Sequence, residues 1–238
     1  MATVQIRAWW WVPAGVLALV LAHLLSPLSF AGWAAGVGYL VVSTVLISTG
    51  LRRRGAERFG PANAVTATRS MLIGVVTAVV VTSFTQPIAA LLLTALVVPT
   101  LALDAVDGWV ARRTGTGTAF GARFDMEADA FLLLVLSAYD VRMVGGWILA
   151  IGLMRYVYVA VGWALPWMRA TVPFRYWRKV VTAVCGFALV LMATGLLPWP
   201  VAVITGAVAL GLLVESFGRD VIWLIRVNSQ RRSLVTTP

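Results

Sequence analysis

The chain has 238 residues, of which 61% are hydrophobic and 12% are charged, and its mean hydropathy is +0.91. This composition excludes an ordinary water-soluble globular domain and indicates a membrane protein. The net charge of +10 arises from cations dispersed among short segments between apolar runs, which argues against a nucleic-acid-binding surface.

Apolar runs long enough to cross about 30 Å of hydrocarbon recur along the chain. They do not alternate with period two, so we expect an all-α polytopic membrane bundle and not a β-barrel. The eight expected spans cover approximately residues 9–28, 33–51, 63–84, 87–111, 121–139, 144–165, 179–197 and 200–225.

The first two runs, within residues 1–51, predict an amino-terminal transmembrane helix pair. The first run is long and is flanked by tryptophans suited to a membrane interface, which favours an uncleaved helix over a secretory signal. His23 lies in this run without an obvious partner, and we interpret it as a helix packing or interface residue and not a metal ligand. Residues 52–62 then predict a basic interfacial linker ending near Pro61.

The cations alternate between connections, which predicts the orientation of the chain. Basic residues gather near residues 52–58, 112–113, 169–179 and 226–232, whereas the other connections contain only Arg142. The positive-inside rule therefore places both termini and the connection after Arg112 on the cytoplasmic side of a cell membrane.

The third run opens with polar residues at every third position, namely Asn63, Thr66 and Arg69. This spacing lets their side chains face the interior together. Two roles remain open for Arg69, which are contact with a phosphate and snorkelling towards the interface.

The segment from Asp104 to Asp129 contains the most informative pattern, DxxDGxxAR followed by GxxxDxxxD. Asp104 and Asp107 are three residues apart and Asp125 and Asp129 are four apart, so each pair shares one helix face. Two such faces predict a box of four carboxylates, and oxygen ligands at that density suit Mg²⁺, Mn²⁺ or Ca²⁺. Carboxylates at membrane depth indicate a functional site.

Other residues of the pattern suit a phosphate-bearing ligand. Gly108, Ala111 and Gly121 are small and allow close approach, and Arg112 is a planar cation that suits phosphate. Glu127 projects from nearly the opposite side of the helix from its neighbouring aspartates, so we do not expect it to be a metal ligand.

This pattern resembles the signature of the CDP-alcohol phosphotransferase (CDP-alcohol phosphatidyltransferase) family of membrane enzymes. The resemblance implies a six-helix core at residues 63–226, preceded by the added helix pair and followed by a cytoplasmic tail at 227–238. It also implies a CDP-linked lipid donor such as CDP-diacylglycerol, a small alcohol acceptor, release of CMP, contact with membrane lipid and possible homodimerisation.

The resemblance implies roles for individual residues. Asp104, Asp107 and Asp125 would hold one or two Mg²⁺ or Mn²⁺ ions, and Asp129 would join them and act as the general base. The remaining positions would form the cytidine and phosphate cradle, namely Gly108, Ala111, Arg112, Gly121, Asn63 and Thr66.

A second, partial resemblance concerns the acceptor. The stretch KVVTAVC from Lys179 is similar to KxKTxxQ of members that use an anionic alcohol, but Val181 and Cys185 depart from it. Arg155 lies deep in an apolar run without a local acid, and with Arg178 and Lys179 it indicates a phosphorylated acceptor such as glycerol 3-phosphate or an inositol phosphate. Free inositol, serine or another alcohol remains open.

A non-enzymatic bundle that retains a metal site, such as a transporter or lipid-binding protein, is the alternative function. A transporter should have a polar path through its outer half, and the apolar runs show little of one. The single cysteine, Cys185, is expected to fill a small buried position within a helix.

Overall fold

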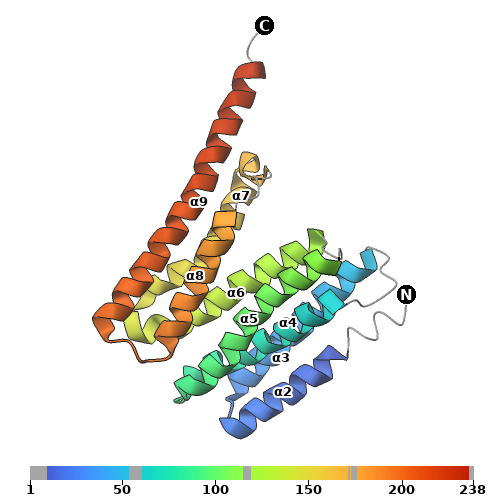
Figure 1. The fold of residues 1–238 in the computed structure, drawn as a ribbon, viewed down its shortest axis with the longest axis vertical. Coiled ribbons are helices and arrows are strands. Elements are labelled where there is room, and N and C mark those ends of the chain that lie inside the picture. Colours follow the sequence, from blue (N-terminus) through green and yellow to red (C-terminus); the bar gives the residue numbers. More distant parts are fainter. Residues whose placement is uncertain (1–9, 54–60, 115–118, 171, 173–175, 236–238) are drawn as a thin grey trace.

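The computed structural model describes residues 10–53, 61–114, 119–170, 172 and 176–235, and their regular structure is helical throughout. Each of the eight expected apolar runs coincides with an α-helix, which confirms the all-α membrane bundle (Figure 1). The helices are α2 (Trp11–Leu25), α3 (Phe30–Arg53), α4 (Pro61–Ser83), α5 (Ala90–Thr114), α6 (Ala119–Val144), α7 (Leu149–Ala164), α8 (Tyr176–Ala193) and α9 (Trp199–Val235). Short 3₁₀ turns at Gly146–Ile148 and Pro166–Arg169 flank α7.

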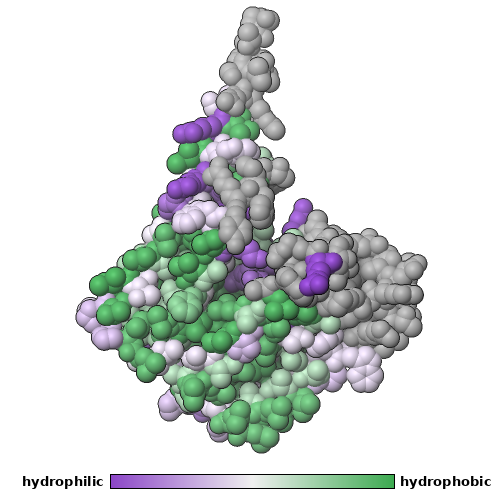
Figure 2. All heavy atoms as spheres, in the orientation of Figure 1, coloured by the Kyte–Doolittle hydropathy of each residue, from purple (hydrophilic) through white to green (hydrophobic). Residues whose placement is uncertain are grey.

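Four helical segments in the described part of the chain are long and apolar enough to cross a membrane. They are Phe30–Gly50, Ala64–Ser83, Gly146–Ala164 and Trp199–Ser229, and Trp11–Leu25 and Ala90–Asp104 are shorter apolar helices. Apolar side chains cover the lower part of the face seen in Figure 2, whereas hydrophilic ones gather along the upper part of α9 and in a central hollow. The protein is therefore a membrane protein.

The helices form two groups that meet at α6. Helices α2 to α5 lie on one side of α6, where α4 packs against it, and α7 to α9 lean away from them towards the carboxyl terminus (Figure 1). Buried side chains of α6, including Leu132 and Leu136, join the same apolar core as Val76 of α4 and Leu189 of α8. Helix α6 thus contacts both groups, and α5 also packs against α8.

The amino-terminal pair packs directly on α4. The Thr82 hydroxyl of α4 accepts a hydrogen bond from the Ser29 backbone N–H at 3.1 Å, and a Cβ on Gly36 of α3 would lie only 2.9 Å from the Ala78 Cβ. Small residues at a helix crossing permit such close approach. Helix α3 therefore supports the helix that carries Arg69.

His23 accepts hydrogen bonds at the carboxyl-terminal end of α2. Its Nδ1 accepts a hydrogen bond from the Leu28 backbone N–H at 2.9 Å and one from Trp33 Nε1 at 3.4 Å. The packing role expected for His23 is confirmed, but the partners come from the turn and from the next helix. The predicted linker falls largely on residues 54–60, outside the described residues, and the predicted tail from residue 227 continues α9.

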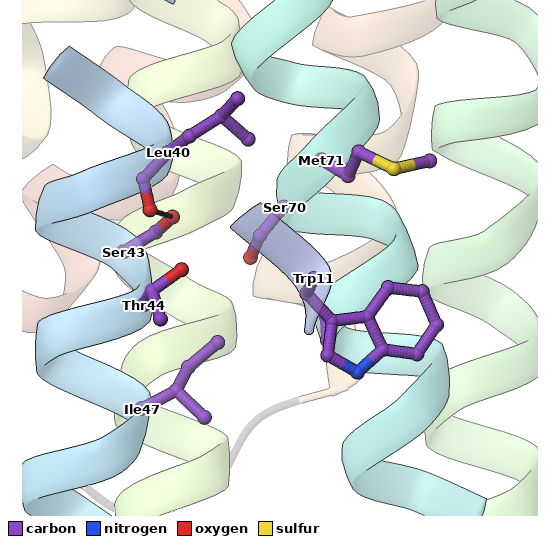
Figure 3. Close-up of a pocket in the computed structure, with 8 residues that line it drawn as sticks. Trp11, Leu40, Ser43, Thr44, Ile47, Ser70 and Met71 are labelled. Carbon is purple, nitrogen blue, oxygen red and sulfur yellow. Dashed lines mark hydrogen bonds between the residues drawn. The ribbon is translucent and has the colours of Figure 1, made fainter. Parts of the chain in front are cut away.

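A small cavity separates α2, α3 and α4 (Figure 3). Three hydroxyl side chains line it, from Ser43 and Thr44 of α3 and from Ser70 of α4. Its volume of about 10 Å³ gives room for about one water molecule. This cavity is too small to hold a substrate.

Close packing of α6 against α7 makes Gly152 intolerant of a side chain. A Cβ there would lie 2.8 Å from the Leu134 backbone nitrogen of α6, whereas a Cβ on Gly162 of the same helix would meet nothing within 4 Å. We expect Gly152→Ala to lower the free energy of unfolding by about 1–3 kcal/mol through overpacking. Gly162→Ala should leave it unchanged or raise it by about 1 kcal/mol, because alanine favours helix.

Thermal unfolding in detergent measures both variants against the unmutated protein. A Gly152→Ala protein as stable as Gly162→Ala would contradict the close contact between α6 and α7.

Candidate metal centre

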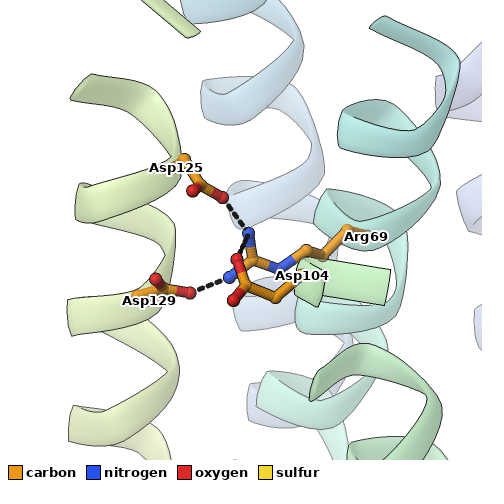
Figure 4. Close-up of polar contacts among 4 residues, drawn as sticks. All are labelled: Arg69, Asp104, Asp125 and Asp129. Carbon is orange, nitrogen blue, oxygen red and sulfur yellow. Dashed lines mark hydrogen bonds and ion pairs between the residues drawn. The ribbon is translucent and has the colours of Figure 1, made fainter. Parts of the chain in front are cut away.

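Two helices bring three of the predicted aspartates together. Asp104 lies on α5, and Asp125 and Asp129 lie one turn apart on α6, as their spacing predicted. One carboxylate oxygen from each residue lies within 4.8 Å of the others. Figure 4 shows the two α6 side chains pointing towards the same point as Asp104. The convergence expected from the sequence is therefore present for these three residues.

Arg69 of α4 reaches into the middle of this carboxylate trio (Figure 4). Its Nη1 lies 3.1 Å from Asp104 Oδ1 and also pairs with Asp125 Oδ1, and its Nη2 pairs with Asp129 Oδ1. The side chain is only 2% exposed. Arg69 does not snorkel, because it is buried and the aspartates of neighbouring helices supply its counter-charge. Contact of Arg69 with a phosphate stays a prediction.

The charge balance of the site favours an additional cation. Three ionised carboxylates and one guanidinium leave a net charge of about −2 on the four side chains, all of which are at least partly buried. Hard carboxylate oxygens are the donors that Mg²⁺ and Mn²⁺ prefer. The residues present therefore fit a divalent cation.

The other predicted metal and nucleotide residues lie on the same helices. The structure places Gly121 in the first turn of α6, one turn before Asp125, and Thr66 one turn before Arg69 on α4. Asn63 lies on α4, and α5 carries Asp107, Gly108, Ala111 and Arg112. The side chains of these residues, and the surroundings of Gly108, lie outside the described part of the structure. The fourth carboxylate ligand stays a prediction.

The expected acceptor residues lie on the other helix group. Arg155 of α7 has a carboxylate partner, because its Nη2 lies 2.5 Å from Glu127 Oε1 of α6. Arg155 has no acid nearby in its own helix, as the sequence indicated, and its partner comes from another helix. As expected, Glu127 points away from its neighbouring aspartates, and it does so towards α7.

Two further basic residues occupy the start of α8. Arg178 Nη1 lies 3.0 Å from the buried Asp220 of α9, whereas Lys179 is exposed. Arg219 of α9 pairs with Glu215 one turn earlier. Arg155 and Arg178 are therefore each committed to a carboxylate in this structure.

Cys185 occupies the buried helical position that was expected. Its side chain is fully buried within α8, and its thiol donates to the Ala209 backbone carbonyl of α9 across 3.4 Å. This contact joins α8 to α9 inside the apolar core. Cys185 therefore has a packing role.

Comparison with known proteins identifies a family for this chain. A family model described as CDP-alcohol phosphatidyltransferase matches residues 59–214, about two thirds of the sequence. The matched region begins just before α4 and contains Arg69 and the three converging aspartates. No curated protein and no solved structure matches the chain.

The geometry predicts how divalent cations bind in the absence of substrate. We expect Asp125→Asn to weaken Mn²⁺ binding by about tenfold or more, or about 1.4 kcal/mol, because one anionic ligand is lost. Glu127→Gln, two residues away on the same helix, should leave the affinity unchanged because Glu127 faces α7. Electron paramagnetic resonance of free Mn²⁺ measures both.

Equal Mn²⁺ affinity in the Asp125→Asn variant and the unmutated protein would contradict the assignment of the trio as a metal site.

Proposed function

The chain belongs to the CDP-alcohol phosphatidyltransferase family, and we propose that it transfers a phosphatidyl group from a CDP-linked lipid to an alcohol in phospholipid biosynthesis. CDP-diacylglycerol is the proposed donor. The observation that carries this proposal is the convergence of Asp104, Asp125 and Asp129 inside the region that the family model matches.

The proposed reaction is a single displacement at phosphorus. The alcohol oxygen forms a bond to the β-phosphorus of the donor, and the bond from that phosphorus to the bridging oxygen of the diphosphate breaks. CMP leaves with the bridging oxygen and its electron pair, and the alcohol loses its proton. The product is a phosphodiester, and the chain forms no covalent intermediate.

The aspartates divide this work between binding and proton transfer. Asp104, Asp107 and Asp125 would hold Mg²⁺ or Mn²⁺, as one or two ions, with a contribution from Asp129. Such a cation, when bound, neutralises charge on the diphosphate and on the leaving CMP. Asp129 would accept the proton of the attacking hydroxyl, a role for which a carboxylate within hydrogen-bond reach of the substrate is suited.

The donor's nucleotide would lie at the ends of α4, α5 and α6 that carry the aspartates. Gly121, one turn before Asp125 in α6, would allow the diphosphate to approach the backbone closely. The other proposed cradle residues are Asn63, Thr66, Gly108, Ala111 and Arg112. Because basic residues gather at this end of the helices, we place the site and both termini on the cytoplasmic side of the cell membrane.

We propose a phosphorylated alcohol, such as glycerol 3-phosphate or an inositol phosphate, as the acceptor. Lys179 is an exposed cation at the start of α8, and Arg178 precedes it. Arg155 and Arg178 are paired with Glu127 and Asp220. An acceptor phosphate that bound either arginine would therefore have to displace the paired carboxylate or share the arginine with it.

The proposal is tested by CMP release from CDP-diacylglycerol with Mg²⁺ or Mn²⁺ and one acceptor at a time. Glycerol 3-phosphate, inositol 1-phosphate, inositol and serine form the panel. Release that depends on one acceptor supports the transferase and identifies its product. A folded protein that neither releases CMP nor binds CDP would instead support a non-enzymatic bundle that retains a metal site.

Asp129→Asn tests the general base. We expect turnover to fall by about 10²-fold or more, because an amide cannot accept the hydroxyl proton, while CDP binding is retained. Glu215→Gln, which removes a carboxylate engaged with Arg219 and Trp177, is the control and should retain turnover. Normal turnover by the Asp129→Asn protein would overturn the assignment.

Lys179→Gln tests the acceptor site. If Lys179 binds the acceptor phosphate, the KM for the phosphorylated acceptor should rise about tenfold with little change in kcat or in the KM for the donor. Arg226→Gln, which removes an exposed cation from the carboxyl-terminal part of α9, provides a charge-matched control. Equal changes in the two variants would attribute the effect to net charge and not to acceptor binding.

A further inference from the structure

Arg69 is the most completely buried charged side chain at the candidate metal centre. It is 2% exposed and contacts carboxylates from two other helices, Asp104 of α5 and Asp125 and Asp129 of α6. A buried guanidinium is stable only where counter-charge and hydrogen bonds replace the water it has lost. Arg69 therefore depends on the same carboxylates that are suited to a divalent cation.

The carboxylates depend equally on Arg69. Their oxygens lie within 4.8 Å of one another, a separation at which like charges repel strongly in a partly buried site. Nη1 of Arg69 bridges Asp104 and Asp125, and Nη2 binds Asp129. The guanidinium thus supplies the positive charge that allows the trio to converge.

A divalent cation and this guanidinium compete for the same ligands. The cation needs lone pairs of the converging oxygens, and Arg69 uses the Oδ1 atom of all three aspartates. Two positive centres within one such cluster also repel each other. We propose that Arg69 is an internal stand-in for the divalent cation, holding the three carboxylates together in the cation-free protein and leaving them when the cation binds.

This proposal rests on the metal dependence of the proposed function and gives Arg69 a positioning role, because it acts through the metal ligands. Once displaced, its planar guanidinium needs another anion, and a phosphate of the donor has suitable geometry. Cation loading would then turn Arg69 from the carboxylates to the donor.

The sign of one measurement separates a stand-in from a fixed structural support. A support that merely orients the aspartates would help the cation to bind, so its removal would weaken Mn²⁺ binding. A stand-in competes with the cation, so its removal would strengthen Mn²⁺ binding. The two roles therefore predict opposite changes in affinity.

The experiment is a Mn²⁺ titration of the full chain in detergent, without substrate, followed by electron paramagnetic resonance. We expect Arg69→Gln to bind Mn²⁺ about tenfold more tightly than the unmutated protein, and Arg69→Lys to lie between them because it retains charge without the fork. Arg142→Gln is the control, since Arg142 bonds to Ser83 near the opposite end of α6. Unchanged or weaker binding by Arg69→Gln would overturn the proposal.

Thermal unfolding keeps the test decisive if Arg69→Gln is unstable without a cation. After chelation, we expect the Tm of Arg69→Gln to be lower than that of the unmutated protein. We expect Mn²⁺ to raise the Tm of Arg69→Gln by more than it raises the Tm of the unmutated protein, because the cation replaces the missing charge. The same Mn²⁺-induced increment in both proteins would contradict the stand-in. Neither measurement uses CMP release, so failure of the transferase assay is distinguishable from failure of this inference.

Discussion

The buried contact between Arg69 and three aspartates is the constraint on which the arrangement of α4, α5 and α6 depends. Charges withdrawn from water destabilise a protein unless they are paired, and each partner here comes from a different helix or a different turn. A shift of one helix relative to the others would leave charge unpaired at membrane depth. The same contact that fixes the helices therefore fixes the distances between the candidate ligands.

Helix α6 connects this centre to the rest of the bundle because its two faces carry different acids. Asp125 and Asp129 face α4 and α5, whereas Glu127 pairs with Arg155 of α7. The close approach at Gly152 holds α7 against α6 farther along. Helix α6 thus contacts both the candidate metal ligands' partner Arg69 and the proposed acceptor residue Arg155.

The sequence predicted the helices and the shared face of Asp125 and Asp129, because these follow from apolar run length and from 3.6-residue periodicity. Periodicity does not give the register of one helix against another. For that reason the sequence could not give the carboxylate partners of Arg69, which come from α5 and α6, or the partner of Arg155, which comes from α6. A lone arginine in the apolar α4 was nevertheless a usable signal, since it required an anion from elsewhere.

The central claim is that the carboxylate trio binds a divalent cation that engages the donor's diphosphate. Pulsed electron paramagnetic resonance of the protein with Mn²⁺ and CDP tests this most directly, because it detects ³¹P nuclei close to bound Mn²⁺. The account predicts a ³¹P coupling that is seen with the protein present and not with Mn²⁺ and CDP alone, and that is smaller in the Asp104→Asn variant. Protein-bound Mn²⁺ without ³¹P coupling, or a coupling indifferent to Asp104→Asn, would contradict it.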